Sequence, residues 1–233
     1  MSQSHKVFIE GETIDLCIPS KLAIEQDGWA DWFNDPKVCE NLDRGVFPHY
    51  EETQYEFLDS LKNNQRFAVM IKPKNTNKII GIISLSEIRY DKKSAQISII
   101  IGGKTLPIGN FYALEAMALV TEHGFEKMGL NRIWAGQAIP KLCKWNKFLE
   151  LLGYKTEGIL RDGFVKGREV SDIAVIACLY NDYKNLKLKR GGSLWSNAKE
   201  MKQAVRQLPK EGFADKLVKL MNELEKKHFN YHK

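Results

Sequence analysis

Three apolar segments in close succession constrain the fold of this chain more than any other feature. They read RFAVMI (66–71), KIIGIISLSEI (78–88) and AQISIII (95–101), and their β-branched residues favour strands. The gaps between them, KPKNTN and RYDKK, are polar and short enough for hairpin connections. The sequence therefore predicts an antiparallel meander of three strands.

The segments around this meander predict helices and further strands. Apolar residues at helical spacing mark 111–127, and the run RIWAGQAI (132–139) has the pattern of another strand. A meander followed by alternating strands and helices is typical of an α/β domain with a mixed, mostly antiparallel sheet flanked by helices. The other predicted elements are two short strands within 6–18, helices over 20–33, 51–61 and 140–152, and a closing hairpin of strands at 154–165 and 169–179.

The composition is that of a globular protein with a packed core. Apolar residues make up 43% of the 233 residues and charged residues 27%. No apolar run reaches the roughly 20 residues that a membrane-spanning helix needs, and the polar start MSQSHK leads directly into a strand. We therefore expect a cytoplasmic protein with no membrane contact. The four cysteines lie far apart without a CxxC pair, which predicts reduced, mostly buried thiols and no metal site.

The positive charge of the chain is concentrated at its C-terminal end. From Lys184 onward, 13 lysines and arginines stand against five acidic residues, and this +8 leaves −2 of the net +6 for the residues before it. We therefore divide the chain into a main domain, residues 1–183, and a basic helical extension, residues 184–233.

The extension contains two amphipathic segments. Apolar residues repeat at intervals of three and four within 194–208 and again within 213–224, and residues 209–212 separate the two. The pattern predicts an antiparallel helical hairpin after a linker at 187–192. Neither helix can bury its apolar stripe alone, so we expect it to dock on the main domain or on a second subunit, which would give a homo-oligomer. Nucleic acid is disfavoured as the partner because acidic residues interleave with the basic ones.

Seven short phrases occur in a fixed order between residues 6 and 183. They are FIEGETIDLCI (8–18), WFNDPKV (32–38), IIGIISL (79–85), AQISIIIG (95–102), EAMALVTEHGFEKMGLNRI (115–133), LGYKTEGILRD (152–162) and a late Asp172. Together they resemble the GNAT acyltransferase superfamily, in particular its branch of ribosomal-protein and sugar-amine N-acetyltransferases. The extension lies outside the resemblance.

The resemblance implies acetyl-coenzyme A as the cofactor. A loop between a strand and a helix, here TLPIGNFYALEA (105–116), can hold a diphosphate with its backbone N–H groups and the helix dipole. The family places a glycine where this chain has Phe111, and Phe111→Gly should tighten binding if the ring obstructs the diphosphate. Gly109 could instead supply the close approach, or the loop could be a plain connection. The implied cofactor residues are Ile100, Ile101 and Gly102 for the thioester carbonyl, and Gly109, Asn110, Phe111, Tyr112 and Ala113 for the diphosphate.

The resemblance also shows that the proton-handling residues of the family are replaced. Its usual Glu aligns with Gln96, its Asn with Leu142 and its Tyr with Leu149. Glu87 and Asp172 remain as catalytic candidates, while a base acting through water, or no base at all, stays open. The segment 31–55 is expected to cover the acceptor groove, and its candidates for substrate binding are Trp32, Arg44, His49 and Tyr50.

The function implied by the resemblance is transfer of acetyl from acetyl-coenzyme A to a primary amine of a small molecule, with an amino-sugar nucleotide as the best single expectation. A protein N-terminal acetyltransferase is the alternative within enzymes. A non-catalytic GNAT module that binds a partner or nucleic acid through its basic extension is the alternative outside them.

Overall fold

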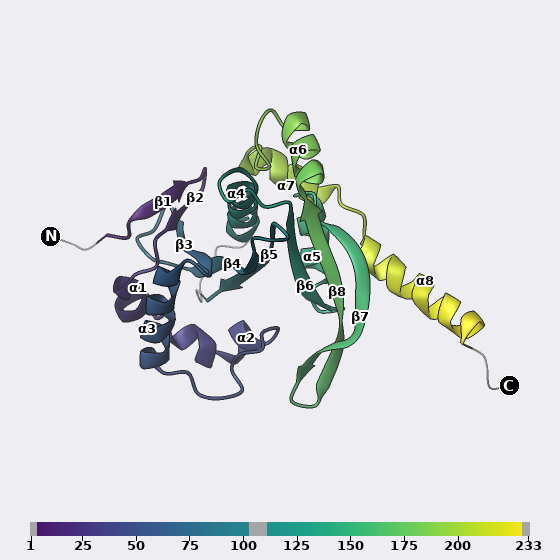
Figure 1. The fold of residues 1–233 in the computed structure, drawn as a ribbon, viewed down its shortest axis with the longest axis horizontal. Helices are drawn as coiled ribbons and strands as arrows, with labels where there is room; N and C mark the ends of the chain where they lie inside the picture. Colours follow the sequence, from purple (N-terminus) through teal and green to yellow (C-terminus); the bar gives the residue numbers. More distant parts are fainter. Residues whose placement is uncertain (1–3, 103–110, 230–233) are drawn as a thin grey trace.

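The chain folds around one sheet of eight strands (Figure 1). A computed structural model describes residues 4–102 and 111–229. The strands lie in the order β1-β2-β3-β4-β5-β6-β8-β7, and every neighbouring pair is antiparallel except β5 with β6. They are β1 (Val7–Glu10), β2 (Ile14–Cys17), β3 (Phe67–Pro73), β4 (Gly81–Arg89), β5 (Ser94–Ile101), β6 (Arg132–Ile139), β7 (Lys155–Lys166) and β8 (Glu169–Leu179).

The predicted meander is confirmed as β3, β4 and β5. Phe67 pairs with Leu85 across the first hairpin, and Gly81 pairs with Ile101 across the second. The two polar gaps form the connections, as their composition predicts. The mixed, mostly antiparallel sheet flanked by helices is likewise confirmed.

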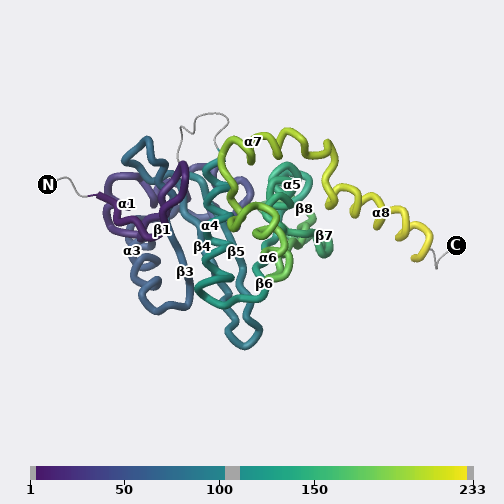
Figure 2. The backbone as a smooth tube through the Cα atoms, turned by 90° about the horizontal axis from the view of Figure 1, so that it is seen from above, coloured from purple at the N-terminus to yellow at the C-terminus, as the bar shows by residue number. Residues whose placement is uncertain are grey.

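Helices cover both faces of this sheet (Figures 1 and 2). Side chains alternate between the faces along each strand, and the central strand β4 buries residues on both of them. The helices are α1 (Lys21–Asp27), α2 (Pro36–Cys39), α3 (Glu51–Ser60), α4 (Tyr112–Glu126), α5 (Cys143–Glu150), α6 (Tyr180–Lys189), α7 (Ala198–Arg206) and α8 (Phe213–His228), with 3-10 turns at Asp31–Asn34 and Leu61–Asn63.

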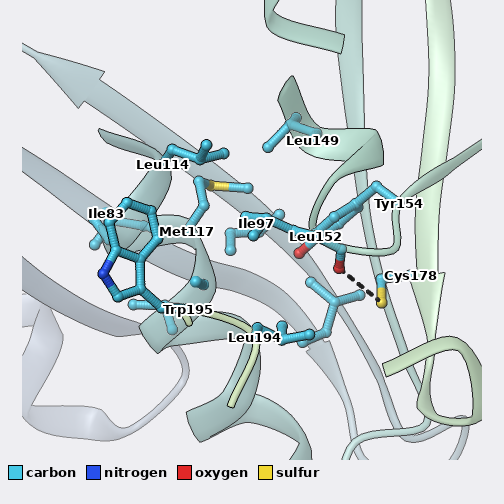
Figure 3. Close-up of a cluster of buried hydrophobic side chains, with 14 of the residues drawn as sticks. Ile83, Ile97, Leu114, Met117, Leu149, Leu152, Tyr154, Cys178, Leu194 and Trp195 are labelled. Atoms are coloured by element: carbon cyan, nitrogen blue, oxygen red, sulfur yellow. Dashed lines mark hydrogen bonds between the residues drawn. The ribbon is translucent and has the colours of Figure 1, made fainter. Parts of the chain in front are cut away.

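One face of the sheet carries the larger core, with α4 at its centre. Leu114 and Met117 of α4 lie beside Ile83 of β4 and Ile97 of β5, and all four side chains are almost completely buried (Figure 3). Burying an aliphatic side chain of this size stabilises a fold by about 2 kcal/mol. The helical spacing of 111–127 thus predicted both the helix and its buried face.

The other face carries a second core formed by α1, the turn that follows it, α2 and α3. Trp29, Trp32 and Phe33 are buried there against Met70 and Ile82 of the sheet. The single helix predicted over 20–33 is wrong. Gly28 adopts a left-handed conformation with φ of 68° and ends α1, and a separate 3-10 turn follows at Asp31–Asn34.

The C-terminal extension packs against the main domain. Leu194 and Trp195 are buried beside Met117 of the main core (Figure 3), and α7 continues along the same side. The two predicted helices form, but α8 packs on β7 and α5 and leads away from α7 rather than folding back on it (Figure 2). The predicted linker is short, because α6 continues through Lys189 and only Gly191 and Gly192 adopt positive φ. The boundary at residue 183 therefore lies within α6, and the division into domain and extension stays a prediction.

Glu115 of α4 joins the β1–β2 turn to the core. Its carboxylate is completely buried and accepts hydrogen bonds from the backbone N–H groups of Glu12 and Thr13 and from the Thr13 hydroxyl. Glu12 in turn accepts from the Trp195 indole N–H at 2.8 Å and from the Ala198 backbone N–H at 2.7 Å. The Glu115 carboxylate thus fixes the β1–β2 turn, and the Glu12 carboxylate of this turn fixes the start of α7.

The predicted buried thiols are confirmed. All four cysteines are free, and three of them, Cys17, Cys39 and Cys178, are buried. Within residues 4–102 and 111–229, no group of three or more His, Cys, Asp or Glu side chains is arranged to hold a metal ion. None of the helices in these ranges is long and apolar enough to cross a membrane.

Candidate active site

The sheet opens between β5 and β6, its one parallel pair of strands. The two strands pair at Ser94 with Arg132, Ala95 with Ile133 and Gln96 with Trp134, and no pairing continues beyond the last of these. Residues Ile97–Ile101 and Ala135–Ile139 therefore face each other across a gap, which we call the cleft.

The backbone of β5 presents hydrogen-bonding groups to this cleft. The Gly102 N–H donates to the Ile80 carbonyl at 2.9 Å, a bond that makes the adjacent partners Gly81 and Ile101 a non-hydrogen-bonded pair in the register of β4 with β5. Because such pairs alternate along antiparallel strands, the N–H groups of Ile99 and Ile101 point away from β4, towards the cleft. Of the three positions predicted to bind the thioester carbonyl, only Ile101 directs its N–H group into the cleft. The N–H group of Ile99, which was not predicted, points the same way.

The cleft has a volume of about 310 Å³ and a neutral lining. Its polar side chains are the amides of Asn41, Gln96 and Gln137 and the hydroxyl of Ser98, which lies 3.0 Å from that of Ser84. The Asn41 Oδ1 is buried and has no hydrogen-bond partner in the described part of the chain. No ionisable side chain is found among the described residues that line the cleft. The apolar part of the lining comes from Val38, Leu42, Ile97, Ile99, Ile100, Ile101, Ala113, Met117, Leu142 and Trp145, with Gly136 beside them.

Lys166 holds the segment after α2 over this side of the sheet. Its ammonium, near the tip of the β7–β8 hairpin, donates to the carbonyls of Cys39, Leu42 and Arg44, the last at 2.8 Å. Three carbonyl acceptors satisfy all three donors of the ammonium group. Asn41 and Leu42 of the cleft lining lie within the segment that Lys166 holds.

The predicted cofactor residues divide into three groups. Ile100, Ile101 and Ala113 line the cleft, whereas the Gly102 N–H is already bonded to Ile80. Tyr112 is buried in the main core as the first residue of α4. Gly109 and Asn110 lie outside the described residues. At the N-terminal end of α4 the Glu115 N–H donates to the Phe111 carbonyl, and the dipole of the helix favours an anion at this end.

The Phe111 ring packs away from the cleft lining. It meets the Phe148 ring of α5 edge to face, with centroids 6.1 Å apart and planes at 71°. There it lines a second hollow of about 620 Å³ between α4, α5 and the end of α7, which we call the outer hollow. The ring is therefore part of the wall of the outer hollow, and the effect of Phe111→Gly on cofactor binding stays a prediction.

The predicted substrate residues lie around the cleft but do not line it. Trp32 is buried against Gly102, where a Cβ would overlap the indole ring. His49 is held by hydrogen bonds with Asn34 and Gln54, and its ring lies tilted at 48° to that of Phe33. Arg44 and Tyr50 are exposed to solvent. The segment 31–55 contributes Val38, Asn41 and Leu42 to the lining instead.

The two predicted catalytic carboxylates also lie outside the cleft. Glu87 is an exposed residue with φ of 49° at a bulge between β4 and β5, near the end where β5 and β6 are still paired. Asp172 accepts a hydrogen bond from the Asp162 N–H at 2.9 Å and lies among residues beneath α8. Asp172 thus stabilises the bulge of β7, and the structure does not bring either carboxylate to the cleft.

Three amide side chains at or near the cleft are not predicted from the sequence. Asn41 and Gln137 line the cleft, and Asn146 is 3% exposed with neither amide atom hydrogen-bonded among the described residues. Asn146 lies one turn beyond Leu142, the position where the family resemblance expects an asparagine. In the sequence, Asn146 lies at helical spacing between two apolar residues, Leu142 and Leu149. A polar residue on an apolar helix face is the signal that could have identified it.

The cysteine thiols do not offer a nucleophile. Burial raises the pKa of Cys17 to about 11 and that of Cys178 to about 12. Burial, reinforced by a hydrogen bond with Asp215, raises the pKa of Cys143 to about 12, and burial raises the pKa of Cys39 as well. Raised pKa values favour the protonated thiol at neutral pH, and none of the four cysteines lines the cleft.

The splayed sheet with its neutral cleft defines an α/β domain of the acyltransferase type. A family model described as an acetyltransferase (GNAT) domain matches residues 21–139, slightly more than half of the chain. The chain belongs to this GNAT family and is an acetyl-coenzyme A-dependent N-acetyltransferase.

The chain is 26% identical over 172 residues to an uncharacterized N-acetyltransferase p20 of Bacillus licheniformis, a match that covers 70% of this chain and 92% of that protein. It is 27% identical over 158 residues to a spermidine N(1)-acetyltransferase of Vibrio cholerae, covering 62% of this chain and 86% of that protein.

Solved structures share the fold. A spermidine N-acetyltransferase from Vibrio cholerae in complex with CoA and spermine superposes with a TM-score of 0.65 at 19% identity, covering 74% of this chain and 99% of that one. The microcin C7 self-immunity acetyltransferase MccE in complex with acetyl-CoA and AMP gives a TM-score of 0.59 at 19% identity, covering 72% and 93%.

Proposed function

We propose that the chain acetylates a primary amine of a small molecule in the cleft between β5 and β6. The observation that carries the proposal is the end of β5–β6 pairing after Gln96 and Trp134, which leaves backbone N–H groups of β5 directed into a neutral opening. This opening fits the extended, uncharged arm of acetyl-coenzyme A, because Phe111 does not fill it and its lining offers amides and aliphatic side chains. Acetyl-coenzyme A, when bound, supplies the activated acetyl group as a thioester.

The residues of the chain would bind and orient rather than exchange protons. The N–H groups of Ile99 and Ile101 would hold a carbonyl oxygen on which negative charge develops, a kind of contact that lowers a barrier by about 3 kcal/mol per donor. The orphan Asn41 Oδ1 would accept a hydrogen bond from the amine. Ile100, Ala113 and Met117 would exclude water from the reacting atoms.

The segment that covers the cleft supports a small amine as the acceptor. The segment held by Lys166 leaves an opening lined by Asn41 and Leu42. Similar proteins are named for spermidine and have structures with spermine and with AMP, which makes a polyamine the first acceptor class to test. None of the relatives named above is named for an amino sugar, so an amino-sugar nucleotide is the second class. A cytoplasmic location stays a prediction.

The pH dependence of the reaction tests this assignment. Because no ionisable group lines the cleft among the described residues, the amine must arrive neutral or lose its proton to water. We expect log(kcat/KM) to rise with a slope of one towards the pKa of the amine, about 10 for an alkyl amine such as that of lysine. The measurement is coenzyme A release with a panel of polyamines, amino sugars and peptides between pH 6 and pH 9. It identifies the acceptor and gives the dependence of kcat/KM on pH.

Two matched variants complete this experiment. Glu87→Gln and Asp172→Asn should leave the profile unchanged, because neither carboxylate lines the cleft. A plateau of log(kcat/KM) below pH 8 that disappears in either variant would contradict the assignment. It would show that the substituted carboxylate takes part in catalysis. No activity with any small amine, together with activity on peptide N-termini, would replace the proposed acceptor class.

A further inference from the structure

Helix α8 carries two apolar stripes, and the body of the protein covers one of them. Ala214 and Val218 of this inner stripe pack on the sheet, and Met221 continues it over a hollow beneath the helix. The second stripe lies on a neighbouring face of the helix, and we call it the outer stripe. It consists of Phe213, Leu217, Leu220 and Leu224.

The outer stripe is exposed to solvent. Phe213, Leu220 and Leu224 are each between 51% and 55% exposed, and Leu217 is half-buried. Helix α8 leads away from the rest of the molecule, which leaves much of its surface uncovered (Figures 1 and 2). A contiguous apolar surface of this kind on a folded protein marks an interaction site.

The spacing of the outer stripe is that of a seam between two helices. Its residues lie four, three and four positions apart, so they stay on one narrow face over about three turns of helix. Apolar residues that alternate in this way insert between the side chains of a second helix with the same pattern. The spacing therefore indicates that the partner contributes a helix.

The border of the outer stripe that faces solvent carries one positive and one negative side chain. Lys216 and Glu223 lie two turns apart on this border, and both are exposed. In the described part of the chain, neither of them forms an ion pair, unlike their neighbours Lys219 and Glu225. One end of the border is therefore positive and the other negative.

We propose that the outer stripe is the interface of a homodimer, in which the α8 helices of two copies of this chain pack antiparallel about a twofold axis. Leu217 of each copy then packs on Leu220 of the other at the centre of the seam. The same alignment sets Lys216 of each copy beside Glu223 of the other, so symmetry gives two ion pairs. A parallel alignment would set Lys216 beside Met221 of the other copy, which offers no acid. The inference does not depend on the proposed function.

The hollow beneath α8 accommodates the end of this seam. It has a volume of about 380 Å³, and Leu224, Met221 and Ile159 of β7 contribute apolar lining. Antiparallel alignment brings Phe213 of the second copy to Leu224, and thus to the mouth of the hollow. The aromatic ring at one end of the stripe therefore meets an apolar recess at the other.

A lipid surface is the other occupant that an exposed apolar helix face suggests. A helix that lies on anionic lipid carries basic residues along the borders of its apolar face. In α8, one border carries Glu223 beside Lys216, and the other borders the inner stripe, which packs on β7 and α5. The charges thus favour a second copy of the chain over a membrane.

Sedimentation of the full-length protein over a range of micromolar concentrations tests the interface. We expect a concentration-dependent dimer with twice the 26.7 kDa mass of one chain. Leu220→Asp places a charge at the centre of the seam and should weaken association by about 100-fold or more. Leu220 is 51% exposed in the single chain, so the variant should keep the circular dichroism spectrum of the unmodified protein.

Two outcomes of this experiment would overturn the inference. One is a monomer at every concentration, and the other is a dimer that Leu220→Asp leaves unchanged. Binding of such a monomer to vesicles of phosphatidylserine and phosphatidylcholine, lost in Leu220→Asp, would assign the outer stripe to lipid instead.

Charge reversal tests the antiparallel alignment. Lys216→Glu and Glu223→Lys should each weaken dimerisation by about 10-fold, because two attractive contacts become repulsive. An equal mixture of the two variants should recover the affinity of the unmodified protein, since every contact between unlike chains again joins opposite charges. Lys226→Glu, on the opposite side of α8, is the matched control and should leave the affinity unchanged. A mixture that associates no better than either variant alone would overturn the proposed alignment.

Discussion

Gly102→Ala should destabilise the protein by about 3 kcal/mol, which lowers the melting temperature by roughly 6 to 12 °C for a chain of this size. A Cβ at position 102 would overlap the Trp32 indole, which is 5% exposed in the second core and has no room to retreat. Thermal and urea unfolding of the two proteins measure the loss. The substitution acts at the end of β5, so it should weaken ligand binding in the cleft as well.

Gly158→Ala is the matched control for this prediction. Gly158 also lies in a strand, but a Cβ there would meet nothing within 4 Å, so we expect a change of no more than about 0.5 kcal/mol. A double-mutant cycle with Trp32→Ala isolates the overlap, because Gly102→Ala should cost little once the indole is gone. An equal loss with and without the indole would show that the packing of Trp32 on Gly102 is not the cause.

Glu115→Ala should cost about 4 kcal/mol, because it leaves the Glu12 N–H, the Thr13 N–H and the Thr13 hydroxyl without their acceptor. The loss should spread to the extension, since the Glu12 side chain holds Trp195 and the start of α7. Unfolding by urea measures the first effect, and amide hydrogen exchange of residues 193–201 measures the second.

A cycle between Glu115→Ala and Thr13→Val distinguishes a specific contact from a general disturbance of α4. Thr13→Val removes one donor and keeps the shape of the side chain, so the two losses should be clearly less than additive. Additive losses, or unchanged exchange in residues 193–201, would contradict the connection from α4 through the turn to the extension.

The sheet could be predicted from the sequence because its information is local. The meander follows from apolar runs of strand length bounded by polar gaps, and α4 follows from the spacing of residues such as Leu114, Met117 and Val120. The course of the extension could not be predicted in the same way. Periodicity identifies an apolar stripe but not the surface that covers it, and the stripe of α7 is covered by the core around Met117 rather than by α8.

The candidate site was predictable only in part. The resemblance pointed to the end of β5 and to the segment 31–55, and both contribute to the cleft. Which individual side chains line the cleft could be predicted only in part, because residue type alone does not show exposure. Trp32 has the character of a binding residue but fills the space over Gly102, whereas Asn41 is inconspicuous in sequence and lines the cleft with an orphan oxygen. The direction of the Phe111 ring could not be predicted either, because it depends on contact with Phe148, 37 residues away in sequence.

Calorimetric titration with acetyl-coenzyme A tests the cleft between β5 and β6 most directly, with Ala113→Trp as the blocking variant because Ala113 lines both the cleft and the outer hollow. We predict saturable binding of the unmodified protein with a Kd between about 1 μM and 1 mM, the range of typical KM values. The folded Ala113→Trp variant should show no binding. An absence of heat from the folded, unmodified protein at millimolar ligand, or binding that Ala113→Trp leaves unchanged, would contradict the account.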